Sequence, residues 1–186
     1  GYGGILSLGQ GVFFGLGGYC MAMFLKLEAS SIENTKIQST PGIPDFMDWN
    51  QLTQLPFFWQ PFHSLTFTLI AVVALPTAFA ALVGAAMFKR RVGGVYFAII
   101  TQALAAILTI LIVGQQGYTG GINGITDLRT LKGWDIRTDS AKLILYFVEV
   151  GILFVCIAIA LFIRNSKLGR ILVCLLYTSD AADDTP

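Results

Sequence analysis

The stretch LTFTLIAVVALPTAFAALVGAAMFKRR, residues 65–91, decides the fold class. Residues 65–88 carry no charge, and three basic residues follow at once. A helix rises about 1.5 Å per residue, so this run covers a hydrocarbon core of about 30 Å. Because period-two alternation is absent, helices rather than membrane strands are expected. Together with three similar runs, this predicts an all-α, polytopic transmembrane helix bundle with spans at residues 5–27, 65–88, 95–113 and 143–163.

The composition of the 186-residue chain excludes several function classes. Hydrophobic residues make up 55% and charged residues 12%, against about 25% charged in an average soluble domain. The net charge of +1 leaves no basic excess for nucleic acid. One histidine and three scattered cysteines suggest neither a zinc site nor a disulfide framework. We expect no catalytic, cofactor-binding or metal-binding residue in this chain.

Charge placement predicts the direction of the spans. Lys89, Arg90 and Arg91 lie in the short connection between the second and third spans. Three more basic residues follow the fourth span, and both basic sites are expected in the cytoplasm. The loops 28–64 and 114–142 then lie outside. The first of these loops is rich in Trp, Phe and Pro, which suits a partly structured loop at the headgroup level, although a docking surface is an alternative.

Small residues recur on one predicted face of the first span. A smooth face of this kind lets another helix approach closely, so close packing is the main interpretation and a moving gate is the alternative. The candidate helix-packing residues are Gly3, Ser7, Gly11, Gly15 and Gly18.

Polar groups within the spans give the candidate pathway residues. Thr101 and Gln102 share a mixed face of the third span, and Gln10 lies near the start of the first. A lipid-facing glutamine is costly, so these groups should face protein or a wet cavity. We select Gln10, Thr101 and Gln102 as candidate pathway-lining residues, with an interhelical hydrogen bond as the alternative. Glu149 in the fourth span has either an interfacial, structural role or a functional one.

Three stretches resemble a known family: SLGQGVFFGLGGY (7–19), GVYFAIITQA (94–103) and GQQGYTGGINGITD (114–127). They are similar to the LivM-type permease subunits of ATP-binding cassette importers, the branched-chain amino acid permease family. Within this family the chain looks most like the urea transporter permease. The segment NSKLGR (165–170) resembles the start of the family's cytoplasmic coupling region. The candidate ATPase-coupling residues are therefore Arg164, Ser166, Lys167, Gly169 and Arg170.

The resemblance implies a permease subunit of an ATP-driven importer in the bacterial inner membrane, forming part of the pathway for urea or a related small amide. It implies a second permease subunit, two cytoplasmic ATP-binding cassette ATPases and an extracytoplasmic substrate-binding protein as partners. ATP is then used by the partner subunits, and this chain binds no cofactor and is not an enzyme. A branched-chain amino acid importer, an ion-coupled secondary transporter and a non-transporting scaffold are the alternatives.

The chain departs from the family pattern at its ends. Further spans are expected before residue 1. The segment 174–186 has three aspartates and no basic residue where the cytoplasmic side is expected. We therefore predict a partial permease domain over 1–173 and a non-native or frameshifted tail over 174–186, with a real truncated variant as the alternative.

Overall fold

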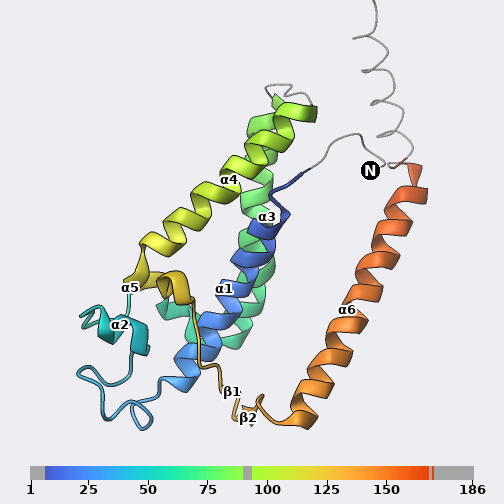
Figure 1. Ribbon diagram of the computed structural model, residues 1–186. Coiled ribbons are helices and arrows are strands. Elements are labelled where there is room, and N and C mark those ends of the chain that lie inside the picture. The colour runs from blue at the N-terminus through green and yellow to red at the C-terminus, as the bar shows by residue number, and fades with distance from the viewer. Residues whose placement is uncertain (1–6, 90–93, 168, 170–186) are drawn as a thin grey trace, which may run out of the picture. The chain divides into compact units, whose positions relative to one another are not determined.

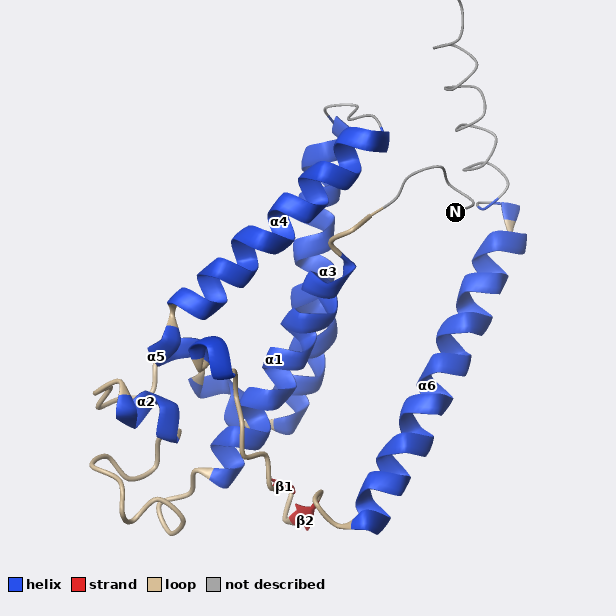
Figure 2. Cartoon of the chain, in the orientation of Figure 1, coloured by secondary structure: helices blue, strands red, loops and turns tan. Residues whose placement is uncertain are grey.

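The computed structural model describes residues 7–89, 94–167 and 169. The described chain divides into two units, 7–137 and the part that begins at Thr138. Figure 2 shows that helices dominate both units. The four longest are α1 (Gln10–Ala29), α3 (Leu65–Lys89), α4 (Gly94–Gly114) and α6 (Asp139–Asn165). All four are long and apolar enough to span a membrane, and the predicted helical class is confirmed.

Two of the four helices begin several residues away from the start that the hydropathy pattern predicts. Helix α6 begins at Asp139 rather than 143, because the Thr138 hydroxyl accepts a hydrogen bond from the Ala141 N–H at 3.3 Å. Helix α1 begins at Gln10 rather than 5, since residues 7–9 are not helical. The expectation that Ser7 lies on the face of this helix is therefore wrong, while Gly3 lies outside the described residues.

In the first unit, the short elements gather at one end of α1, α3 and α4 (Figure 1), here named the loop end. The strands β1 (Thr130–Leu131) and β2 (Trp134–Asp135) are antiparallel, with Leu131 paired with Trp134, and the two-residue turn Lys132-Gly133 joins them. Both turn residues have positive φ, 51° and 79°, as a type I′ turn requires. The other short elements are α2 (Asp45–Trp49), η1 (Gln60–His63), α5 (Gln116–Thr119) and η2 (Gly121–Asn123).

A buried cluster ties the loop 28–64 to the helices of the first unit. Met23 of α1, Met47 of α2 and Phe62 of η1 are all buried in it. Leu27 and Ala71 extend the cluster along α1 and α3. Burial of this apolar surface fixes the loop as a folded cap.

Helices α1 and α3 pack closely where Gly17 of α1 lies against the backbone of α3, one turn before Pro76. Pro76 has no N–H, so the carbonyl of Val72 loses its helical partner. A Cβ atom placed on Gly17 of α1 would lie 3.1 Å from that carbonyl oxygen. The absent side chain therefore lets α1 approach α3 one turn before its proline, and Phe13 and Phe79 also contact each other between these helices, with ring centroids 6.0 Å apart.

Candidate functional site

Thr101 joins the start of α1 to α4. Its hydroxyl accepts a hydrogen bond from the Leu8 N–H at 3.2 Å and donates to the Ala98 carbonyl at 3.0 Å. Gly9 is buried beside it, and a Cβ there would lie 2.7 Å from the Thr101 carbonyl oxygen. This contact satisfies a backbone donor immediately before α1. Because Leu8 is not helical, it is not the interhelical hydrogen bond expected as the alternative for Thr101, and that alternative stays a prediction.

The other two candidate pathway residues lie near this contact in sequence. Gln10 is the first residue of α1 and Gln102 follows Thr101 in α4, and both side chains are exposed. Among the described residues, no side chain caps the N-terminus of α1. The region thus combines two exposed amide side chains with a helix N-terminus that no described side chain caps, and the pathway role of the three residues stays a prediction.

The glycine face of α1 lines two hollows. Gly11, Gly15, Ala105 and Thr109 help to line a hollow of about 270 Å³ between α1 and α4. A second hollow, of about 260 Å³, lies at Gly15, Gly18 and the segment 124–125. A Cβ on Gly11, Gly15 or Gly18 would meet no atom of the described chain within 4 Å. The close approaches occur instead at Gly9, just before α1, and at Gly17 within it, so helix packing on the predicted face stays a prediction.

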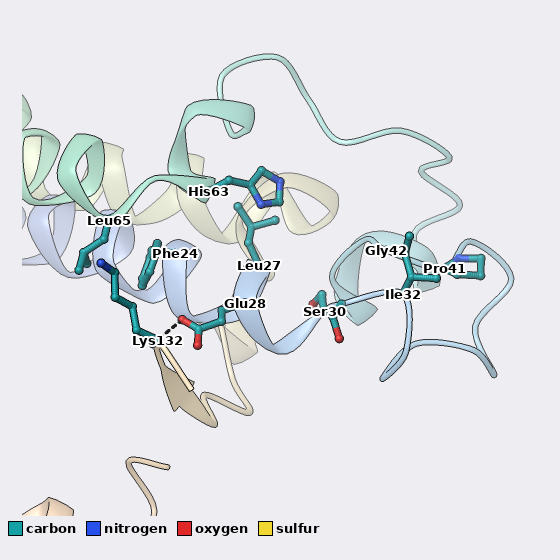
Figure 3. A pocket seen from close by; sticks show the side chains of 11 residues that line it. Phe24, Leu27, Glu28, Ser30, Ile32, Pro41, Gly42, His63, Leu65 and Lys132 are labelled. Carbon is teal, nitrogen blue, oxygen red and sulfur yellow. Dashed lines mark hydrogen bonds between the residues drawn. The ribbon is translucent and has the colours of Figure 1, made fainter. Parts of the chain in front are cut away.

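At the loop end, Glu28 of α1 holds the β-hairpin. Its carboxylate accepts hydrogen bonds from the backbone N–H groups of Lys132 at 2.9 Å and Gly133 at 2.8 Å. Figure 3 shows Glu28 facing the hairpin, in a hollow of about 700 Å³ to which His63 of η1 also contributes. Phe24 and Leu27 add an apolar side, so the hollow presents both apolar and ionisable groups.

Two ion pairs lie near the contact between Glu28 and the β-hairpin. Lys26, with a side-chain exposure of 3%, contacts Asp45 of α2 at 2.9 Å. Arg129 donates to Asp127, with 2.9 Å between Nε and Oδ2. This hydrogen bond is the main cause that lowers the pKa of Asp127 below its ordinary value of 3.8, and the charges of Arg129, Lys26 and Arg137 add to it.

The run 114–121 forms the turn that ends α4. Gly120 has φ +82°, and a Cβ there would lie 2.2 Å from the Gly124 oxygen. The Thr119 hydroxyl lies within hydrogen-bond distance of two carbonyls, that of Ile112 near the end of α4 and that of Gln115 at 2.9 Å, and it can donate its one hydrogen to either. Gly120 therefore allows a left-handed backbone conformation, and Thr119 can satisfy a carbonyl at the end of α4. Both roles are independent of which solute the protein carries.

The candidate coupling segment ends α6 in the second unit. The Ser166 hydroxyl donates to the Ile163 carbonyl at 2.6 Å and accepts from the Gly169 N–H at 3.4 Å. A Cβ on Gly169 would lie 2.5 Å from the carbonyl oxygens of Ile163 and Arg164. Ser166 and Gly169 thus form a compact turn that leaves no room for a larger residue at 169, while Arg170 lies outside the described residues.

Sequence reasoning missed the charged network at the loop end. Lys26 and Glu28 lie near the end of an apolar run, where charges ordinarily reach water. One signal was present: Gly133, between Leu131 and Trp134, favours a turn at this point. No pattern in the sequence links that hairpin to a carboxylate more than a hundred residues earlier.

A family model described as "Branched-chain amino acid transport system / permease component" matches residues 1–183. This range covers all described residues and part of the segment 174–186. No curated protein and no solved structure matches the chain.

Proposed function

The chain belongs to the family of permease components of branched-chain amino acid transport systems, and from this premise we propose that it forms part of the pathway for urea or a related small amide in an ATP-driven importer. The family is one of non-enzymatic, multi-pass membrane components that work with ATPases and a binding protein. The one observation that carries the proposal is the pair of uncharged hollows along α1.

The two hollows support a pathway because they share a residue and have neutral walls. Gly15 lines both, so they follow the same face of α1 toward the loop end. Their described lining contains no Asp, Glu, Lys or Arg; its polar side chains are those of Thr109 and Tyr19. Urea is uncharged, with amide donors and a carbonyl acceptor, so a passage for it needs polar neutral groups rather than charges.

Gln10, Thr101 and Gln102 are proposed to serve the end of this passage that lies away from the loops. Thr101 is one turn from Ala105, which lines the first hollow. The exposed amides of Gln10 and Gln102 can exchange hydrogen bonds with a passing amide. In this proposal Thr101 fixes the start of α1, and the two glutamines contact the solute.

The partners are proposed as a second permease subunit, two cytoplasmic ATP-binding cassette ATPases that use the ATP, and an extracytoplasmic binding protein, in the bacterial inner membrane. Arg164 and Lys167 border the turn at Ser166 and Gly169, and with Arg170 they supply a basic segment for an ATPase surface. The permease domain is proposed to cover 1–173, with 174–186 a non-native tail.

A branched-chain amino acid is the second candidate solute. The description of the matching family names this class, and a zwitterion needs partners for a carboxylate and an ammonium group. The 700 Å³ hollow at the loop end has Glu28 and Lys132 together with the apolar side chains of Phe24 and Leu27. This lining favours a zwitterion with an apolar side chain at the entrance, in contrast to the neutral hollows deeper along α1.

Uptake of labelled urea and labelled leucine by cells that express the intact importer tests both candidates. Urea uptake that stops when an ATPase gene is deleted supports the proposal, and leucine uptake alone rejects urea. Gly15→Leu should reduce urea uptake at equal expression, because the added side chain narrows the space that Gly15 lines. Gly151→Leu on α6, where a Cβ also meets no described atom within 4 Å, is the control.

Gln102→Ala should leave assembly intact and reduce uptake. Unchanged uptake at equal expression contradicts the role of Gln102 as a pathway residue. If Gly15→Leu instead prevents assembly of the complex, the glycine face packs against another helix and the proposed passage is wrong.

A further inference from the structure

Aromatic side chains form a connected surface between the loop 28–64 and α3. Phe57, Phe58 and Trp59 contact one another in sequence, with centroid distances of 5.6 and 5.4 Å. Phe62 continues the chain of rings to Phe67 in the first turn of α3, through contacts of 5.1 and 5.3 Å. The name aromatic surface is used here for the partly or fully exposed members Phe57, Phe58, Trp59, Phe67 and Tyr118.

The rings are exposed although their backbone is fixed. Phe57 is 82% exposed and Phe58 43%. Phe62 beside them is buried in the core cluster, and the Trp59 indole N–H donates to the Tyr118 carbonyl at 3.0 Å. A folded support of this kind presents the rings outward, so their exposure is a property of the loop's structure.

The absence of charged residues around these rings makes this segment suitable for contact with lipid. From Trp49 to Phe88 the sequence has no Asp, Glu, Lys or Arg, and its one histidine is His63. Elsewhere in the same loop, Glu33, Lys36, Asp45 and Asp48 place charges where water is expected. Burying residues 52–64 in lipid headgroups would therefore desolvate no fixed charge.

The aromatic surface continues directly into a membrane-spanning face. Phe67 belongs both to the chain of rings and to the exposed apolar residues of α3, such as Ile70 and Val73. Aromatic rings gather at the boundary between headgroups and acyl chains. We propose that the aromatic surface lies in the headgroup layer of the bilayer, so that residues 52–64 rest on the membrane.

Spin-label accessibility in phosphatidylcholine vesicles tests this placement. The full chain is prepared without native cysteines, by Cys20→Ala, Cys156→Ala and Cys174→Ala, and a label is attached at Phe57→Cys. Ile37→Cys is the matched control, because Ile37 is fully exposed in the same loop but follows Lys36. The ratio of oxygen to nickel-chelate accessibility should be severalfold higher at position 57 than at position 37.

Two results would overturn the proposal. A label at 57 that is as accessible to the nickel chelate as the label at 37 means that the loop extends into water. A label at 57 that neither reagent reaches means that protein rather than lipid covers the surface. Phe58→Cys is measured in parallel, and circular dichroism with size-exclusion chromatography checks that each variant folds.

Discussion

Gly17 of α1 lies against the backbone carbonyl of Val72 in α3, so closely that a methyl group on Gly17 would stand 3.1 Å from that oxygen. The carbonyl is the one that Pro76 leaves without a helical N–H partner. A glycine Cα–H can contact such an oxygen weakly, at a depth where water is scarce. The contact explains how a helix with a proline in its interior packs tightly on its neighbour.

Gly17→Ala should therefore destabilise the first unit, although alanine favours helix formation. We expect the variant to be about 1–2 kcal/mol less stable than Gly18→Ala, because the new methyl group meets a backbone atom that has little freedom to move. Gly18 is the matched control, since a Cβ there meets no described atom within 4 Å. Denaturant unfolding in detergent measures the difference, and equal stability of the two variants would contradict the packing.

Hydropathy and charge predict α3 and α4 well because both helices are bounded by strong local signals. Serine and proline precede Leu65, and the basic run begins at Lys89. The start of α1 has no such signal: it depends on the hydrogen bond from Leu8 to Thr101, 93 residues away. A property of one segment does not reveal where a distant hydroxyl will lie.

In the candidate site, too, local sequence predicts some features, and others depend on residues far away in the chain. Helical spacing places Gly11, Gly15 and Gly18 on one side of α1, and they do line adjoining hollows. The spacing does not say what covers that side. The close contacts at Gly9 and Gly17 depend on Thr101 and Val72 of other helices, and only the folded structure brings these residues together.

The turn after α4 gives a second pair of matched glycine variants. Gly120→Ala should cost at least about 2 kcal/mol more than Gly133→Ala. Both positions have positive φ, +82° and +79°, so both variants bear the backbone penalty of about 1–2 kcal/mol. The Cβ at 120 would also lie 2.2 Å from the Gly124 oxygen, whereas that at 133 meets nothing within 4 Å.

Thermal unfolding in detergent, followed by circular dichroism, compares the two glycine variants. A loss at Gly133 as large as that at Gly120 would show that backbone conformation alone limits both turns. The structural role of the run 114–121 would then be weaker than its geometry indicates.

The pair formed by Asp127 and Arg129 should make stability depend on acid pH. The folded pKa of Asp127 is lowered, so its contribution is present above the ordinary value of 3.8 and is lost as the pH falls through the folded pKa. Both side chains are about 40% exposed, so the contribution is about 0.5 kcal/mol after solvent screening. The difference in unfolding free energy between wild type and Arg129→Gln should shrink as the pH is lowered below 3.8.

The control for this pH effect is the same pair of measurements in an Asp127→Asn background. Arg129→Gln should there cost the same at neutral and acid pH, because the titrating carboxylate is gone. A wild-type difference that stays constant down to acid pH would remove Asp127 as its source.

Lys26 and Asp45 should contribute to the free energy of unfolding as a coupled pair rather than independently. Lys26 is almost fully buried and its ammonium group lies 2.9 Å from the Asp45 carboxylate, which is 27% exposed. Asp45→Asn leaves a buried charge without its counter-ion, and we expect a loss of about 2–3 kcal/mol, reduced from the fully buried case by the partial exposure of Asp45. Lys26→Met in that background should recover much of the loss, since methionine fills similar space without a charge.

A double-mutant cycle in detergent measures this coupling between Lys26 and Asp45. Additive effects of the two substitutions would show that the ion pair does not hold α2 against α1, and that the buried cluster around Met23 and Met47 does so alone.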